Sequence, residues 1–111
     1  MASLQLVKDK QPGSSISLST DGGKTEWSVG RSLDCDINLP HASVSRRHAR
    51  VFNDGSGYYI EDLGSTHGTF VAGARLTEPA RLFDGLRVAF GTSPFELVAL
   101  IFATKKLEGL Q

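Results

Sequence analysis

Hydroxyl, guanidinium and imidazole side chains are concentrated in the middle third of this 111-residue sequence. All three histidines and four of the seven arginines fall between residues 31 and 67. Three segments carry most of them, and each ends or joins short apolar stretches: residues 29–32, 43–48 and 62–70. Binding and catalytic groups are commonly carried by loops on a rigid scaffold. We therefore treat this cluster as the candidate functional site.

Four of these side chains could serve as donors to an anion with several acceptor oxygens: Arg31, Ser45, Arg46 and Thr66. A phosphate monoester carries about −1.5 to −2 charges at pH 7 and three strong acceptor oxygens. A guanidinium donates two parallel hydrogen bonds to such a group, and short hydroxyls add neutral donors. The spacing alone leaves a second interpretation open, in which the arginines are solvated surface charges and the hydroxyls cap turns.

Catalytic and metal-binding chemistry fit the cluster less well. A nucleophilic triad of Ser45, His48 and Asp62 lacks a nucleophile elbow with its oxyanion donors. A metal site would have to use Cys35, His41, His48 and His67. Those residues lack the paired C-x-x-C or H-x-x-x-H spacing of metal ligands. We therefore predict that the protein is not an enzyme and holds neither a metal nor a cofactor.

Composition disfavours several further classes of protein. The 12 Lys and Arg balance the 12 Asp and Glu, and Arg46, Arg47 and Arg50 lack interleaved stacking aromatic residues, which disfavours nucleic-acid binding. One cysteine excludes an intrachain disulfide framework and suits a reducing compartment. The longest apolar run, residues 97–103, is too short to span a bilayer, and the first ten residues lack signal-peptide features. We expect an intracellular protein, nuclear or cytoplasmic, with no membrane or nucleic-acid partner.

Short segments of β type alternate with turn signals along the chain. Twelve glycines exceed the usual share of about 7%, and several follow Asp or Ala at turn positions. No apolar repeat of helical period extends over a dozen residues. Eight segments are rich in β-branched and aromatic residues: 4–7, 15–19, 26–29, 49–52, 58–62, 69–71, 86–90 and 95–101. They predict an all-β, two-sheet sandwich over residues 1–103, followed by a frayed tail at 104–111.

The apolar residues within or near these segments predict the packed interior between the two sheets. The expected core consists of Trp27, Ile37, Val51, Ile60, Phe70, Val88, Phe90 and Leu97.

Three ordered motifs in this sequence resemble those of the forkhead-associated (FHA) domain. They are G-R at residues 30–31, S-x-x-H at 45–48 and D-L-G-S-T-x-G-T at 62–69, and the similarity extends over roughly residues 4–101. Several motifs in order are more specific than one short pattern. The resemblance implies a β-sandwich of about eleven strands whose loops at one end bind phosphothreonine-containing peptides in extended form.

The resemblance also implies roles for individual residues. Arg31, Arg46 and Thr66 match positions that contact the phosphopeptide, and Ser45 matches a serine that binds phosphate through its hydroxyl and backbone N–H. His67 stands where the family usually carries an asparagine that contacts the peptide main chain, and an imidazole can also donate and accept. The positions for which the resemblance implies a scaffold role are Gly30, His48 and Gly68.

The resemblance also implies that variable loop residues set the peptide preference at the third position after the phosphothreonine, for which Ser43 and Ser65 are candidates. The implied partner is a phosphothreonine-containing protein, and we expect the isolated domain to be a monomer. A degenerate FHA domain that binds its partner independently of phosphate is the alternative. Such a domain would be expected to lose Arg31 or Ser45, and both are present.

Overall fold

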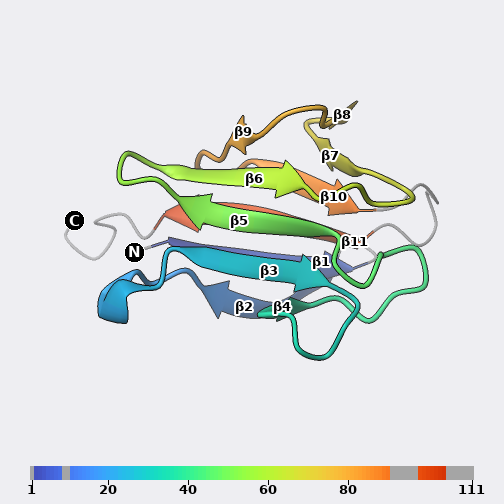
Figure 1. Ribbon diagram of the computed structural model, residues 1–111, viewed down its shortest axis with the longest axis horizontal. Coiled ribbons are helices and arrows are strands. Elements are labelled where there is room, and N and C mark those ends of the chain that lie inside the picture. The colour runs from blue at the N-terminus through green and yellow to red at the C-terminus, as the bar shows by residue number, and fades with distance from the viewer. Residues whose placement is uncertain (1, 9–10, 91–97, 105–111) are drawn as a thin grey trace.

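Two β-sheets form the computed structural model of this chain, which describes residues 2–8, 11–90 and 98–104 (Figure 1). The first sheet has the order β2-β1-β11-β10-β7-β8, with bounds Ala2–Lys8 (β1), Gln11–Ser17 (β2), Thr69–Val71 (β7), Ala74–Arg75 (β8), Arg87–Phe90 (β10) and Val98–Thr104 (β11). The second has the order β4-β3-β5-β6-β9, with bounds Glu26–Gly30 (β3), Ile37–Asn38 (β4), Ala49–Asn53 (β5), Tyr58–Asp62 (β6) and Ala80–Arg81 (β9).

The predicted fold class, an all-β sandwich of about eleven strands, is confirmed. Among the described residues the only helical element is the short 3₁₀ turn Asp21–Gly23, and no helix there is long and apolar enough to cross a membrane. All eight predicted segments overlap a strand. Strands β4, β8 and β9 were not predicted, because two residues are too few to show alternation. Residues 95–97 and 105–111, which include most of the predicted tail, lie outside the described residues.

The sheet register places the three sequence motifs at one end of the molecule. Strands β3, β5 and β6 are antiparallel neighbours, and the register pairs Val29 with Ala49 and Ala49 with Asp62. The chain therefore leaves β3, enters β5 and leaves β6 at the same edge, on the right in Figure 1. The segment after β6 then crosses to the other sheet and begins β7 at Thr69.

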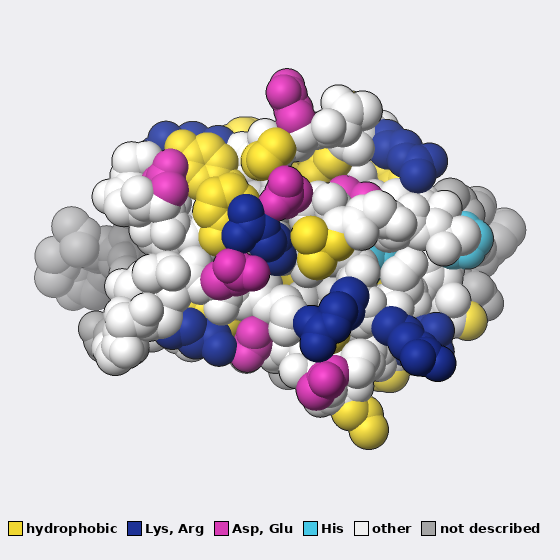
Figure 2. Space-filling view, viewed as in Figure 1, with side chains coloured by type: hydrophobic (Ala, Val, Ile, Leu, Met, Phe, Trp, Pro, Cys, Tyr) yellow, Lys and Arg dark blue, Asp and Glu magenta, His cyan; other side chains and the backbone are white. Residues whose placement is uncertain are grey.

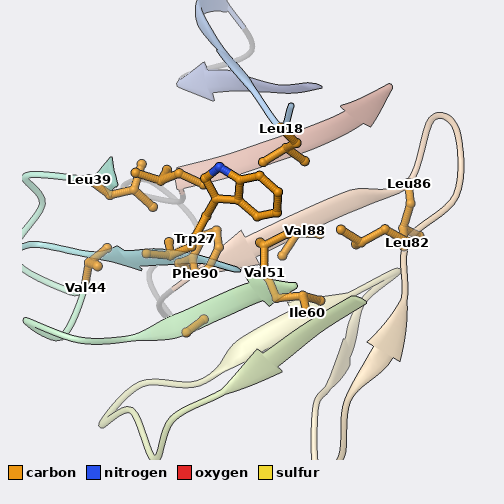
Figure 3. Packing of buried hydrophobic residues seen from close by; sticks show 13 residues of the cluster. Leu18, Trp27, Leu39, Val44, Val51, Ile60, Leu82, Leu86, Val88 and Phe90 are labelled. Carbon is orange, nitrogen blue, oxygen red and sulfur yellow. The ribbon is translucent and has the colours of Figure 1, made fainter. Parts of the chain in front are cut away.

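Apolar side chains from both sheets fill the space between them (Figure 3). Six predicted core residues are buried, namely Trp27, Ile37, Val51, Ile60, Val88 and Phe90. The assignment of Phe70 to this core was wrong, because its side chain is only partly buried. Side chains alternate along β7, and its neighbours Thr69, which is buried, and Val71, which packs against the core, face inward instead. Leu97 lies outside the described residues. Members that were not predicted are Leu18, Val29, Leu39, Val44, Ala49, Leu82 and Leu86.

Candidate functional site

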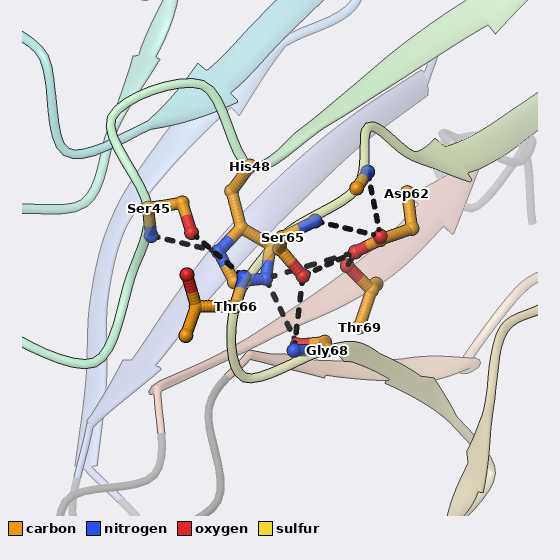
Figure 4. Close-up of polar contacts among 8 residues, drawn as sticks. Ser45, His48, Asp62, Ser65, Thr66, Gly68 and Thr69 are labelled. Atoms are coloured by element: carbon orange, nitrogen blue, oxygen red, sulfur yellow. Dashed lines mark hydrogen bonds and ion pairs between the residues drawn. The ribbon is translucent and has the colours of Figure 1, made fainter.

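A buried imidazole joins two loops at the end of the sandwich (Figure 4). His48 Nδ1 accepts a hydrogen bond from the backbone N–H of Ser45 at 3.0 Å, and Nε2 lies 2.9 Å from the carbonyl oxygen of Gly68. Because the Ser45 N–H can only donate, Nδ1 is unprotonated, and Nε2 carries the hydrogen that it donates to Gly68. Burial lowers the pKa of His48, which favours this neutral form. The ring also packs edge-on against Phe90.

Asp62, the last residue of β6, determines the shape of the following loop. Its carboxylate accepts hydrogen bonds from the backbone N–H groups of Gly64 and Ser65 and from the hydroxyls of Ser65 and Thr69, at 2.6–3.0 Å. Burial raises the pKa of Asp62, but these hydrogen bonds outweigh burial and bring the pKa below its ordinary value. This role was not predicted, although an Asp two residues before a Gly, as Asp62 is before Gly64, is a recognisable Asx-turn signal.

Direct contacts bring the Arg31, Ser45 and Thr66 segments together. The backbone N–H of Arg31 donates to the carbonyl oxygen of Ser45 at 3.0 Å, and the backbone N–H of Thr66 donates to Ser45 Oγ at 3.1 Å. Arg31 Nε donates to the carbonyl oxygen of Val44 at 3.0 Å, so its side chain is held at one nitrogen. Within the described residues the two terminal guanidinium nitrogens of Arg31 have no acceptor, and Ser45 Oγ keeps its own hydrogen to donate.

Gly30 permits the close approach of the two loops that carry Arg31 and Arg46. A Cβ atom at Gly30 would lie 2.0 Å from the carbonyl oxygen of Arg46 and 3.1 Å from Cys35 Sγ. That carbonyl accepts hydrogen bonds from the Ser32 N–H and the Cys35 thiol, both at 3.3 Å. A larger residue at position 30 would therefore separate the two loops.

The remaining predicted contact residues surround this centre. Arg46 and Thr66 are exposed, and His67 is half-buried. The exposed Arg47 lies 3.7 Å from Asp34, a weak surface ion pair. Figure 2 shows basic side chains over the middle and both ends of the molecule, but few acidic side chains toward this end, so a chain of zero net charge is locally basic here.

Two predicted roles are at odds with the observed contacts. The Ser45 backbone N–H, expected at a phosphate, donates to His48 instead. Ser65 is buried, and its hydroxyl donates to Asp62 and accepts from the Gly68 N–H, so this side chain is not presented to a ligand. The other expected selectivity residue, Ser43, is half-buried, with its hydroxyl 2.9 Å from His41 Nδ1.

The contacts are not those of a catalytic triad or a metal centre. His48 faces the backbone N–H of Ser45, while the Ser45 hydroxyl accepts from Thr66. Asp62 Oδ1 is 4.0 Å from His48 Nε2 and is already bonded within its own loop. In the part of the chain that the structure describes, no three His, Cys, Asp or Glu side chains are grouped so that they could hold a metal ion.

Comparisons of this chain with known proteins agree on one family. A family model described as "FHA domain" matches residues 27–91, more than half of the chain. The chain is similar to the Mycobacterium tuberculosis "FHA domain-containing protein FhaB", with 41% identity over 69 residues that cover 62% of this chain and 44% of that protein. The chain thus spans less than half the length of that relative.

Solved structures with similar folds include two that are nearly fully covered by this chain. One is described as "Structural and functional analysis of phosphothreonine-dependent FHA domain interactions"; its TM-score is 0.75, with 30% identity, over 95% of this chain and 99% of that chain. Another is the "Crystal structure of the FhaA FHA domain complexed with the intracellular domain of Rv3910", with a TM-score of 0.71 and 29% identity over 89% of this chain and 98% of that chain.

Proposed function

The chain belongs to the FHA family, and from this premise we propose that its loop end binds phosphothreonine in an extended peptide and so mediates phosphorylation-dependent protein–protein interaction. The FHA domain is a non-catalytic binding module. The observation that carries the proposal is the direct contact among Arg31, Ser45 and Thr66, which come from three separate segments.

These three residues supply different donors to a phosphate group. Arg31 offers its two terminal guanidinium nitrogens as a bidentate pair, while its Nε bond to Val44 limits the freedom that binding removes. The Ser45 and Thr66 hydroxyls add neutral donors, and the exposed Arg46 adds a second positive charge nearby. Each charge-assisted hydrogen bond contributes about 1.5–3 kcal/mol.

His67 completes the proposed site next to the phosphate contacts. It follows Thr66 in the same loop and is half-buried. Its imidazole can donate from one nitrogen and accept at the other, which suits the main chain of an extended peptide. We assign Gly30, His48 and Gly68 to the scaffold that holds these loops, because their contacts lie between the loops.

Calorimetric titration with a phosphothreonine peptide library and matched unphosphorylated peptides tests the proposal. We expect binding only to phosphorylated peptides, with a loss of at least about ten-fold in affinity for Arg31→Ala. Arg87→Ala is the matched control, because Arg87 is an exposed arginine at the start of β10. Equal affinity for both peptide forms would instead indicate a phosphate-independent interaction module.

A further inference from the structure

The outer face of the sheet β4-β3-β5-β6-β9 carries an aromatic pair between two arginines. The rings of Phe52 in β5 and Tyr59 in β6 stack with their centroids 5.5 Å apart. The guanidinium of Arg50 lies 4.2 Å from the centre of the Phe52 ring, and that of Arg81 in β9 lies 5.7 Å from the centre of the Tyr59 ring. Figure 2 shows hydrophobic side chains grouped over the left part of β5 and β6, with basic side chains next to them. Aromatic and arginine side chains are enriched in protein–protein interfaces, so this face is a candidate contact surface.

Arg81 is held in place but has no counter-ion among the described residues. Its Nη1 donates to the hydroxyl of Tyr59 at 3.3 Å, and its Nη2 donates to the carbonyl oxygen of Ser56 at 3.0 Å. A Cβ atom at Gly57 would lie 2.7 Å from Nη2, so the guanidinium also packs over the Gly57 backbone. Arg50, by contrast, forms ion pairs with two glutamates. Because a guanidinium has five N–H donors, Arg81 keeps three for a partner, and little freedom is lost when it binds.

A depression with acidic and apolar walls lies on the same face, between β6 and the segment that leads into β9. Its volume is about 240 Å³, and it is lined by Glu61, Asp62, Leu76, Thr77, Glu78 and Pro79. The carboxylate of the exposed Glu78 has no partner among the described residues, and Glu61 binds Arg50 through one of its two oxygens. Leu76 and Pro79 supply apolar walls against which the stem of a basic side chain can pack. The depression therefore suits a lysine or arginine side chain.

We propose that this face pairs with the same face of a second copy of the chain, with Arg81 of each copy against Glu78 of the other. In a two-fold symmetric dimer every contact occurs twice, so a self-complementary face must carry both members of each pair. Here the unpaired cation and the unpaired carboxylate lie at the same edge of one sheet, in β9 and in the segment just before it. A two-fold axis midway between them passes near Tyr59, which pairs with Arg81 in the sheet register. Dimerisation would therefore also bury the aromatic pair.

The size of this face predicts a weak dimer. A standard interface uses about 20–30 residues on each side, many more than parts of three strands provide. We expect a dissociation constant on the order of 0.1 mM, so that the chain is a monomer at low concentration, as the sequence predicts, and pairs at high concentration. The pairing is independent of the proposed phosphopeptide binding, because none of its residues belongs to the proposed phosphopeptide contacts.

Sedimentation equilibrium of the wild type and of charge-reversal variants, from about 0.01 to about 1 mM, tests this pairing. We expect the average mass of the wild type to rise toward that of a dimer. Arg81→Glu and Glu78→Arg should each weaken association at least about ten-fold, because like charges then face each other in both contacts. Arg87→Glu is the matched control and should associate like the wild type. It makes the same change in net charge as Arg81→Glu, but Arg87 lies in β10 of the other sheet.

Mixing the two variants distinguishes a specific contact from misfolding and from a net-charge effect. The Arg81→Glu variant has carboxylates at both positions and the Glu78→Arg variant has guanidiniums at both, so opposite charges face each other again in the mixed dimer. This mixture should associate about as strongly as the wild type. A mixture of Arg87→Glu with Glu78→Arg has the same net charges and should associate less. A wild type that stays monomeric at about 1 mM, variants that associate as the wild type does, or a mixture that associates no more than its control would each overturn the proposal.

Discussion

Replacing His48 with alanine removes both hydrogen bonds that join the Ser45 and Gly68 loops. The variant leaves the Ser45 N–H and the Gly68 carbonyl without their partner, and each buried unsatisfied group costs about 1–3 kcal/mol. It also removes a fully buried ring that packs against Phe90, which adds a cavity. We expect the free energy of unfolding to fall by about 3–5 kcal/mol, a large part of the stability of a small domain.

Two further variants separate the two bonds of His48. Asparagine can place its amide oxygen near the position of Nδ1 and accept from Ser45, while glutamine can place its amide nitrogen near Nε2 and donate to Gly68. We expect each to lose less stability than alanine. Because Ser45 belongs to the proposed phosphate contacts, His48→Asn should keep more phosphopeptide affinity than His48→Gln.

The pH dependence of stability gives an independent measure of the same bridge. Burial holds the pKa of His48 below its ordinary value, so the unfolded chain binds the proton first as the pH falls. The contribution of neutral His48 is therefore complete above about pH 6.5 and is lost as the pH falls from there through the folded-state pKa. His67 and Asp62 also face this ring and are present in both wild type and His48→Asn. The difference in unfolding free energy between the two proteins at each pH therefore isolates the contribution of His48.

Urea denaturation at pH 7.5 and at a series of lower pH values measures these quantities, with peptide calorimetry in parallel. Unfolding free energies of wild type and His48→Ala that agree within about 1 kcal/mol would refute the bridge as a determinant of stability. Parallel pH profiles for wild type and His48→Asn between pH 5 and pH 7 would refute the neutral, buried state of His48.

Three further predictions concern other contacts. Gly30→Ala should lower the free energy of unfolding by about 2 kcal/mol or more and weaken phosphopeptide binding, because its Cβ would collide with the Arg46 carbonyl. Unchanged urea denaturation and unchanged peptide affinity would contradict this. Asp62→Asn should lower the free energy of unfolding by about 1–3 kcal/mol at pH 7. Because the pKa of Asp62 is lowered in the folded protein, the wild type should lose more stability than this variant as the pH falls below about 4. Urea denaturation of both proteins at pH 7 and pH 3 checks both expectations. Arg50→Ala removes the exposed ion pair with Glu26 and the partly buried one with Glu61, and should cost about 1 kcal/mol without changing peptide affinity in calorimetry. A large fall in affinity would place the ligand elsewhere.

Much of the fold could be predicted from local patterns. Alternation in residues 58–62 correctly indicated β6, and the other predicted segments overlap strands, but β2 spans Gln11–Ser17 rather than the predicted 15–19. Strand β4 could not be predicted, because its two residues are ordered by parallel pairing with β3, a tertiary contact. The core contributions of Leu39, Val44 and Leu82 were also missed, since these residues lie in connections where periodicity gives no signal.

The sequence motifs predicted which residues form the site better than they predicted the contacts among those residues. The motifs indicated Arg31, Ser45 and Thr66, which the structure brings together. Spacing could not show that the Ser45 N–H is used by His48, because that bond depends on the ring orientation.

Binding of phosphothreonine at the loop end is tested most directly by mapping amide chemical shifts during titration with a phosphothreonine peptide and its unphosphorylated form. We predict saturable shifts of the Arg31, Ser45 and Thr66 amides with the phosphorylated peptide only. Equal shifts with both peptides, or shifts confined to Arg50 and Phe52 on β5, would contradict it.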